Sequence, residues 1–149
     1  MEKSVKKILC FISCVLLFMM QISVVAGNKY SGNHNSEPPL SHTELERFVL
    51  VSETENNRVV MMNTTGTIVW EKTGLNAPYD ADLLINGNIL ITELYGNRVI
   101  EVDKTGTMVW SKTGLNTPHD ADRMANGNTL IAETANQRVI EVNNQGDIV

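Results

Sequence analysis

Cysteine occurs only within the first 14 residues of the 149-residue chain, as Cys10 and Cys14. The rest of the chain therefore has neither disulfides nor thiolate chemistry. Basic residues are also few, since 12 Lys and Arg face 17 Asp and Glu and give a formal net charge of −5. The lack of a basic cluster argues against nucleic-acid binding and against docking on an anionic membrane surface. No stretch has the periodicity of an amphipathic helix.

The first 26 residues have the features of a leader. Three lysines precede an apolar run over residues 8–26, which ends in the small residue Ala26. The pattern predicts a signal peptide at 1–26, with an uncleaved N-terminal membrane anchor as the alternative, because the run is nearly long enough to span a bilayer. Either way we expect a secreted or extracytoplasmic protein that meets a membrane only through this segment. Without it, 9 basic and 16 acidic residues leave a charge of about −7.

Residues 27–45 are rich in Gly, Asn, Ser and Pro and hold few large apolar residues. This composition predicts a disordered linker. His34 and His42 lie in it, but no other residues are spaced to join them in a metal site. The folded part of the chain is therefore expected over residues 46–149.

Residues 46–149 repeat with a period of 40. Between 56–95 and 96–135, 23 of 40 residues are identical, and a third copy opens at Arg138. Trp70 and Trp110 predict a further Trp directly after Val149. We therefore expect a repeat architecture whose units bury their faces against one another, in a chain truncated at its C-terminus.

Each unit has four short β-type segments between turn signals. In the unit of His119 they are 119–124, 129–133, 138–142 and the apolar run that ends at the Trp. Asn86-Gly87 and Asn126-Gly127 predict hairpins in which both turn residues have positive φ. The Asn-rich turns at Asn56-Asn57, Asn97 and Asn136 fit positive φ as well.

Four short antiparallel strands every 40 residues predict an all-β fold, a partial β-propeller of four-stranded blades. A solenoid of β-hairpins is the weaker alternative. About two and a half blades are present, and they begin at the second strand of a blade, because Leu40-Ser41-His42 lacks the Asp-Ala-Asp of later units. Open blade faces and strand edges are an aggregation hazard. The expected partners therefore include the missing C-terminal blades or other copies of the chain.

Three kinds of residue recur every 40 positions and are predicted to hold the blades together. Trp70 and Trp110 end the outer segment and are expected to pack between blades, burying about 150–250 Å² each, with a ligand platform as the alternative. Each of three glutamates comes five residues before an arginine across a tight turn, which suits a charge pair between two strands. The pairs are Glu53–Arg58, Glu93–Arg98 and Glu133–Arg138. A catalytic role for these carboxylates is disfavoured because every blade has one.

The paired aspartates open the first strand of each blade, the strand that lines the central channel of a propeller. Alternation places both members of a pair on one face of the strand. Turn capping is the structural interpretation, and a channel site for a ligand or a cation is the functional one. The residues are Asp80, Asp82, Asp120 and Asp122. No metal-binding motif is complete, and no other cofactor is predicted.

Tyr79 is replaced by His119 one unit later, so matching blades differ here. A specific site would be built at such a position, and His119 is the one histidine within 46–149. His119 is therefore the candidate catalytic residue, and Tyr79 a candidate ligand contact. Arg123 shares the face of His119 only if the strand is regular. Separately, Asn63-Thr64-Thr65 is an N-x-Thr sequon on a predicted turn and makes Asn63 a candidate glycosylation site.

The segment GNTLIAETANQRVIEV, with HDADRMANGN before it and G-x-(I/M)-V-W after it, resembles the repeats of bacterial and archaeal arylsulfotransferase-like propellers. Its Asn-x-Arg-(Val/Ile) step is similar to the NHL repeat. The segment 103–106 running to Trp110 resembles the repeat of quinoprotein (PQQ-type) propellers. The resemblance covers 47–149 and implies the propeller fold. Quinone binding is not implied, because the shared residues are structural.

The arylsulfotransferase resemblance also implies an activity. That family moves a sulfuryl group between phenolic compounds through a channel histidine, and other histidines and basic residues stabilise the developing charge. His119 matches such a histidine and Tyr79 departs from it. The favoured hypothesis is an exported scaffold that binds a protein, a glycan or a small molecule. The alternative is a fragment of an arylsulfotransferase-like enzyme.

Overall fold

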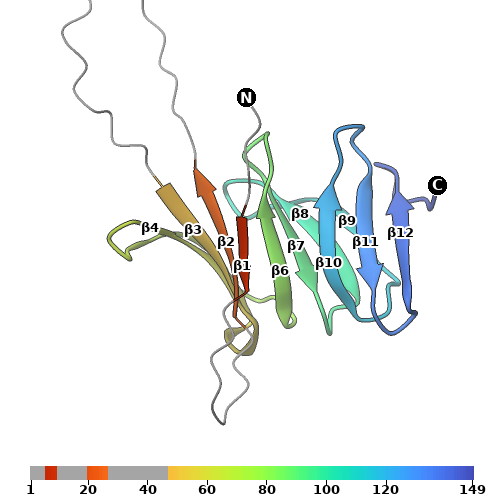
Figure 1. The fold of residues 1–149 in the computed structure, drawn as a ribbon, viewed down its shortest axis with the longest axis horizontal. Helices are drawn as coiled ribbons and strands as arrows, with labels where there is room; N and C mark the ends of the chain where they lie inside the picture. The colour runs from red at the N-terminus through yellow and green to blue at the C-terminus, as the bar shows by residue number, and fades with distance from the viewer. Residues whose placement is uncertain (1–5, 10–19, 27–46) are drawn as a thin grey trace, which may run out of the picture.

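A computed structural model describes the backbone of residues 6–9 and 20–26 and all of residues 47–149 (Figure 1). The predicted linker at 27–45 lies outside these residues, and so does the middle of the predicted leader. In the described ranges, no helix has the length and apolar character that crossing a bilayer requires. The leader at 1–26 stays a prediction.

The chain forms three antiparallel sheets that stand side by side (Figure 1). We call them the first, second and third blade. The first contains β1 (Lys6–Leu9), β2 (Met20–Ala26), β3 (Arg47–Glu53), β4 (Arg58–Asn63) and β5 (Ile68–Lys72). The second contains β6 (Pro78–Leu83), β7 (Ile89–Glu93), β8 (Arg98–Val102) and β9 (Met108–Lys112). The third contains β10 (Pro118–Arg123), β11 (Thr129–Glu133) and β12 (Arg138–Val142). This confirms the predicted all-β fold, a partial β-propeller.

The first blade differs from expectation at its inner edge. The sequence predicts that the blades begin at a second strand, β3 here, with no inner strand before it. In the structure β2 pairs with β3 in an antiparallel ladder, from Met20 opposite Glu53 to Ala26 opposite Arg47. β2 thus lies where β6 lies beside β7 in the second blade. β2 lacks the Asp-Ala-Asp pattern of the later inner strands, so the repeat pattern did not indicate it.

The hydrophobic core lies between the blades in two clusters. Ile89 and Ile91 of β7 belong to the cluster shared with the first blade, and Leu90 between them belongs to the cluster shared with the third blade. Side chains alternate across a strand. Every residue of β7 is therefore buried. This two-sided burial explains why the second segment of each unit is a nearly continuous apolar run.

The Asn-Gly turns are built differently from the prediction. Gly87 and Gly127 have φ of 85° and 88°, whereas Asn86 and Asn126 are not among the positive-φ residues. Gly87 N donates to Leu84 O at 3.0 Å, and Leu84 N donates to Asn88 O at 2.8 Å. Asn86 Oδ1 instead accepts the amide of Asn88 at 3.0 Å. An asparagine that bonds to the backbone two residues on stabilises a type I turn, and the glycine then takes the left-handed position.

The turns between the second and third strands carry positive φ at one repeated position. Asn57, Asn97 and Gln137 have φ of 52°, 50° and 51°. The prediction for Asn136 is wrong, since the left-handed residue is its neighbour. Asparagine tolerates this region better than other non-glycine residues because its short polar side chain bonds locally.

The asparagines at this position also bond to the next unit. Asn57 Oδ1 accepts the amide of Ala77 at 2.9 Å, and Asn97 Oδ1 accepts the amide of Thr117 at 3.0 Å. Ala77 and Thr117 themselves have φ of 51°. The sequence did not indicate these two positions, because alanine and threonine rarely adopt positive φ. The hydrogen bond from the preceding blade holds each of them at the start of an inner strand.

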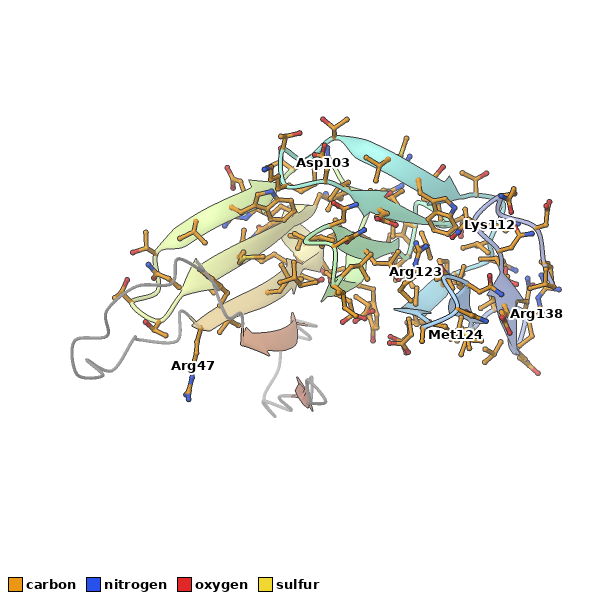
Figure 2. The ribbon with its side chains drawn as sticks, turned by 90° about the horizontal axis from the view of Figure 1, so that it is seen from above. Arg47, Asp103, Lys112, Arg123, Met124 and Arg138 are labelled. Carbon is orange, nitrogen blue, oxygen red and sulfur yellow. The ribbon has the colours of Figure 1, made fainter. Side chains whose placement is uncertain are left out.

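The tryptophans join each blade to the following one. Trp70 Nε1 donates to Lys104 O at 3.1 Å, and Trp110 Nε1 donates to Asn144 O at 2.9 Å. Both rings also pack against the hydrophobic clusters between blades. Lys112 donates from Nζ to Gly146 O at 2.8 Å in the same turn that receives Trp110 (Figure 2). The outer strands are thus held to the next blade.

Candidate functional site

The side chains that differ between the repeats lie where the inner strands begin. On β6, Pro78 pairs with Glu93 and Asp80 pairs with Thr92, so Tyr79 is left out of the ladder as a bulge. On β10, the pairing of Pro118 and Asp120 leaves out His119 in the same way. A β-bulge redirects a side chain away from the regular alternation of its strand. Sequence reasoning missed this bulge, because it leaves no composition signal.

The two bulged residues contact each other across the second and third blades. The rings of Tyr79 and His119 meet edge to face, with centroids 4.6 Å apart and an interplanar angle of 86°. His119 Nδ1 forms a hydrogen bond with Thr134 Oγ1, in which the donor depends on the imidazole tautomer. The structure therefore brings together the two residues that the sequence singled out. It adds Thr134, which sequence reasoning missed.

Neighbouring turns add further groups at the same end of the sheets. β6 begins opposite Glu93, where β7 ends, so the β7–β8 turn lies beside Tyr79. That turn exposes Tyr95 by 70%, and the amides on either side of Tyr95 bond to Ala77 O and Asn76 O, just before Tyr79. We call Tyr79, Tyr95, His119 and Thr134, which lie at this end of the sheets, the aromatic rim. Tyr95 corresponds to Glu55 and Ala135 in the other units. This variation among otherwise similar units is the sequence signal that could have indicated Tyr95.

The aspartates of each pair lie on one side of their strand. Asp82 pairs with Leu90 and Asp80 pairs with Thr92. Leu90 belongs to the cluster shared with the third blade, so these carboxylates are on the side of the third blade. Asp80 is 4% exposed, whereas its equivalent Asp120 is half-buried. The following blade therefore determines how deeply each carboxylate is buried.

The described residues bring together no group of three or more His, Cys, Asp or Glu side chains that could hold a metal ion. The cation suggested for Asp80, Asp82, Asp120 and Asp122 therefore stays a prediction. Two carboxylates per strand give a strand too few ligands for Ca²⁺, which takes six to eight oxygens in proteins.

The repeated glutamates each contact the arginine five residues later. Glu53 lies 2.5 Å from Arg58, and Glu133 lies 2.5 Å from Arg138, both from Oε2 to Nε. Glu93 and Arg98 form the same pair. In the later blades the second carboxylate oxygen accepts a backbone amide from the preceding connection, Asn76 at 2.6 Å and Asn116 at 2.8 Å. Each buried glutamate thus fixes the loop that leads into its own blade.

These contacts change the acidity of the glutamates. The hydrogen bonds from Arg58 and Asn56 lower the pKa of Glu53. Burial alone would raise the pKa of Glu133, but hydrogen bonds from Arg138 and the Asn116 amide outweigh it and lower that pKa. Both carboxylates therefore stay charged at neutral pH, and they act as acceptors that tie strands and loops together.

Arg123 does not share the site of His119. Its Nη2 donates to Glu101 Oε2 at 2.8 Å, and its guanidinium lies 5.0 Å from the ring centroid of Trp110. Figure 2 shows Arg123 between the second and third blades. The bulge at His119 breaks the regularity on which a shared face would depend. The arginine nearest to His119 in the sequence thus pairs with Glu101.

The predicted glycosylation residue has a local structural contact. Asn63 Oδ1 accepts the backbone amides of Thr65 at 3.0 Å and Thr67 at 2.9 Å. Asp103 makes the same two contacts one unit later, at 2.8 Å and 3.0 Å. The side chain at this position stabilises the turn between the third and fourth strands. A glycan on Asn63 stays a prediction.

Residues 28–149 match the profile of the PQQ_2 family, described as outer membrane protein assembly factor BamB. The chain belongs to this family. Of the three resemblances read from the sequence, the comparisons thus show the PQQ-like one. The arylsulfotransferase and NHL resemblances stay predictions. No curated protein matches the chain.

Several solved structures share the propeller fold. The streptogramin B lyase structure has a TM-score of 0.58 and 19% identity, over 68% of this chain and 36% of that one. A catalytically inactive histidine-to-alanine variant of virginiamycin B lyase from Staphylococcus aureus, with quinupristin, has a TM-score of 0.59 and 18% identity, over 99% of this chain and 59% of that one. A candidate exported protein from Bacteroides fragilis has a TM-score of 0.53 and 11% identity, over 87% and 41%. The chain thus spans less than two thirds of each structure, and the likeness concerns the fold alone.

Proposed function

We propose that the chain is an exported β-propeller module that binds a protein partner at the aromatic rim. The observation that carries the proposal is the contact between Tyr79 and His119. Two bulges direct these side chains out of otherwise regular ladders. Tyrosine supplies a large apolar surface with a polar end, which makes it common at binding surfaces.

The family description supports the class of partner. The family is described as an assembly factor for outer membrane proteins, and the fold is shared by a candidate exported protein. Unassembled outer-membrane strands are segments of about ten residues in which apolar and polar residues alternate. The aromatic rim would contact the apolar side chains of such a segment. The acidic charge of the chain disfavours acidic partners.

The experiment measures binding of a fluorescently labelled ten-residue peptide with alternating aromatic and polar residues. Tyr95→Ala and Tyr79→Ala are expected to weaken the peptide affinity by about tenfold each. The matched control is Ile85→Ala, since Ile85 is fully exposed in the β6–β7 turn at the opposite end of the blade. If the rim variants bind as the wild type does, or if Ile85→Ala weakens binding equally, the rim is not the binding surface.

The second candidate function is sulfuryl transfer between phenolic compounds with His119 as the nucleophile. The hydrogen bond between His119 Nδ1 and Thr134 Oγ1 favours it, because an Nδ1–H donated to Oγ1 would leave Nε2 unprotonated for attack. The engagement of Arg123 with Glu101 weighs against it, since the sulfuryl oxygens lose a nearby guanidinium. Release of nitrophenolate from 4-nitrophenyl sulfate in the presence of phenol tests this candidate. Activity that His119→Ala abolishes would support the enzyme, and no release would reject it.

A further inference from the structure

One face of the third blade is apolar and uncovered. Val59, Val99 and Val139 occupy the same position in three successive units, and they are 0%, 0% and 65% exposed. Val59 and Val99 belong to the clusters between blades. Leu90 is 1% exposed, and Leu130, which follows it by 40 residues, is half-buried. The third blade therefore presents the surface that each earlier blade uses to contact its successor.

The two existing interfaces differ in chemistry at one place. Between the first and second blades, Met61, Trp70 and Leu83 all pack against the same apolar cluster. Between the second and third blades, the same three positions hold Glu101, Trp110 and Arg123. Glu101 and Arg123 form an ion pair at 2.8 Å, with the guanidinium over the Trp110 ring. Each interface is thus matched, with apolar facing apolar or acid facing base.

Glu141 is held by the same pair of asparagine hydrogen bonds that holds Glu101 in position for Arg123. Oε1 of Glu101 accepts hydrogen bonds from Nδ2 of Asn86 at 3.2 Å and of Asn88 at 2.6 Å. Oε1 of Glu141 accepts hydrogen bonds from Nδ2 of Asn126 at 3.3 Å and of Asn128 at 2.6 Å. Oε2 of Glu101 receives Arg123, whereas Glu141 pairs with no cation in the described part of the chain. The carboxylate of Glu141 is therefore held in position beside an exposed valine.

We propose that this face, defined by Leu130, Val139 and Glu141, docks a further 40-residue blade that carries an arginine where β10 carries Arg123. The contact continues the interface already present between the second and third blades. A blade with leucine at that place, as in β6, would bury Glu141 without a cation, which is strongly unfavourable. A neutral or acidic partner surface is disfavoured for the same reason.

The test appends a second copy of residues 110–149 directly after Val149 of the full chain. The copy supplies the Trp that the period expects next and places its own arginine opposite Glu141. Accessibility is read from alkylation of Val139→Cys, with Cys10→Ser and Cys14→Ser as background. The extension is expected to slow alkylation by about tenfold or more, because a buried thiol reacts only after local opening. Unchanged alkylation in the extended chain would overturn the docking face.

Two matched variants test the role of charge. Arg123→Leu in the appended copy alone is expected to restore fast alkylation. Glu141→Met added to that variant is expected to return protection, because it recreates the apolar side chains that Met61 and Leu83 supply at the first interface. If the leucine copy protects Val139→Cys as well as the arginine copy does, Glu141 does not select its neighbour. A thermal melt that gains no stability from either copy would also overturn the proposal.

Discussion

Glu101 of β8 accepts a 2.8 Å hydrogen bond from Arg123 of β10 across the interface between the second and third blades. Side-chain exposure is 9% for the glutamate and 18% for the arginine. A pair this buried is costly to break, because the remaining charge has no partner and little water. The pair thus makes one interface specific without adding to the apolar core.

Arg123→Leu is expected to destabilise the chain by about 3–5 kcal/mol, since Glu101 would stay buried and unpaired. The double variant Glu101→Met with Arg123→Leu is expected to recover most of that loss, because it copies Met61 and Leu83. Urea unfolding followed by tryptophan fluorescence gives the free energies. A double variant as unstable as the single one would contradict this assignment.

The uncovered face gives a direct comparison between equivalent valines. Val99→Ala is expected to cost about 2 kcal/mol, because it removes buried methyl groups and leaves a cavity. Val139→Ala is expected to change stability by less than about 0.5 kcal/mol, as surface substitutions do. Their exposures are 0% and 65%. Equal costs in urea unfolding would mean that another part of the chain covers Val139.

Replacement of Asn97 separates backbone strain from hydrogen bonding. Asn97→Gly keeps the left-handed φ and loses the bond to Thr117 N, at a cost of about 0.5–1.5 kcal/mol. Asn97→Ala adds a strain of about 1–2 kcal/mol. The control is Gln145→Ala, which lies outside the positive-φ positions and is exposed. An alanine variant no less stable than the glycine variant in thermal melts would argue against strain at Asn97.

Stability is expected to fall in acid. The pKa values of Glu53 and Glu133 are lower in the folded chain than their ordinary value of 4.5. A lowered folded pKa contributes stability above the unfolded pKa, and that contribution is lost as the pH falls through the folded value. Melting temperatures should therefore drop below about pH 4.5. Glu133→Gln should reduce this dependence as well as the stability at pH 7, and an unchanged pH profile would reject the role of Glu133.

Much of the fold was predictable because the repeat supplies the same local signals several times. The predicted segments 129–133 and 138–142 coincide with β11 and β12. The Glu–Arg pairs were predictable as well, because a separation of five residues across a tight turn leaves the two side chains close together. The turn details were less predictable. Asn86 and Gly87 suit two turn types, and the hydrogen bond from Asn88 to Asn86 Oδ1 selects one.

The candidate site was only partly predictable. The change from Tyr79 to His119 marks the place, but the bulge and Thr134 depend on how strands pair. Arg123 lies four residues after His119, yet contacts Glu101, 22 residues away. Pairing between blades depends on side chains that are far apart in the chain, so no local pattern records it.

The sequence by itself determined the repeat, the strand order within a blade and the all-β class, because alternation, turn residues and a period of 40 are local properties. The tertiary structure decided which face each side chain meets. Asp80 is buried and Asp120 is not, although Ala and Asp follow both of them, because a following blade covers one and not the other. Burial, and with it the chemistry of each carboxylate, is a property of the packed blades.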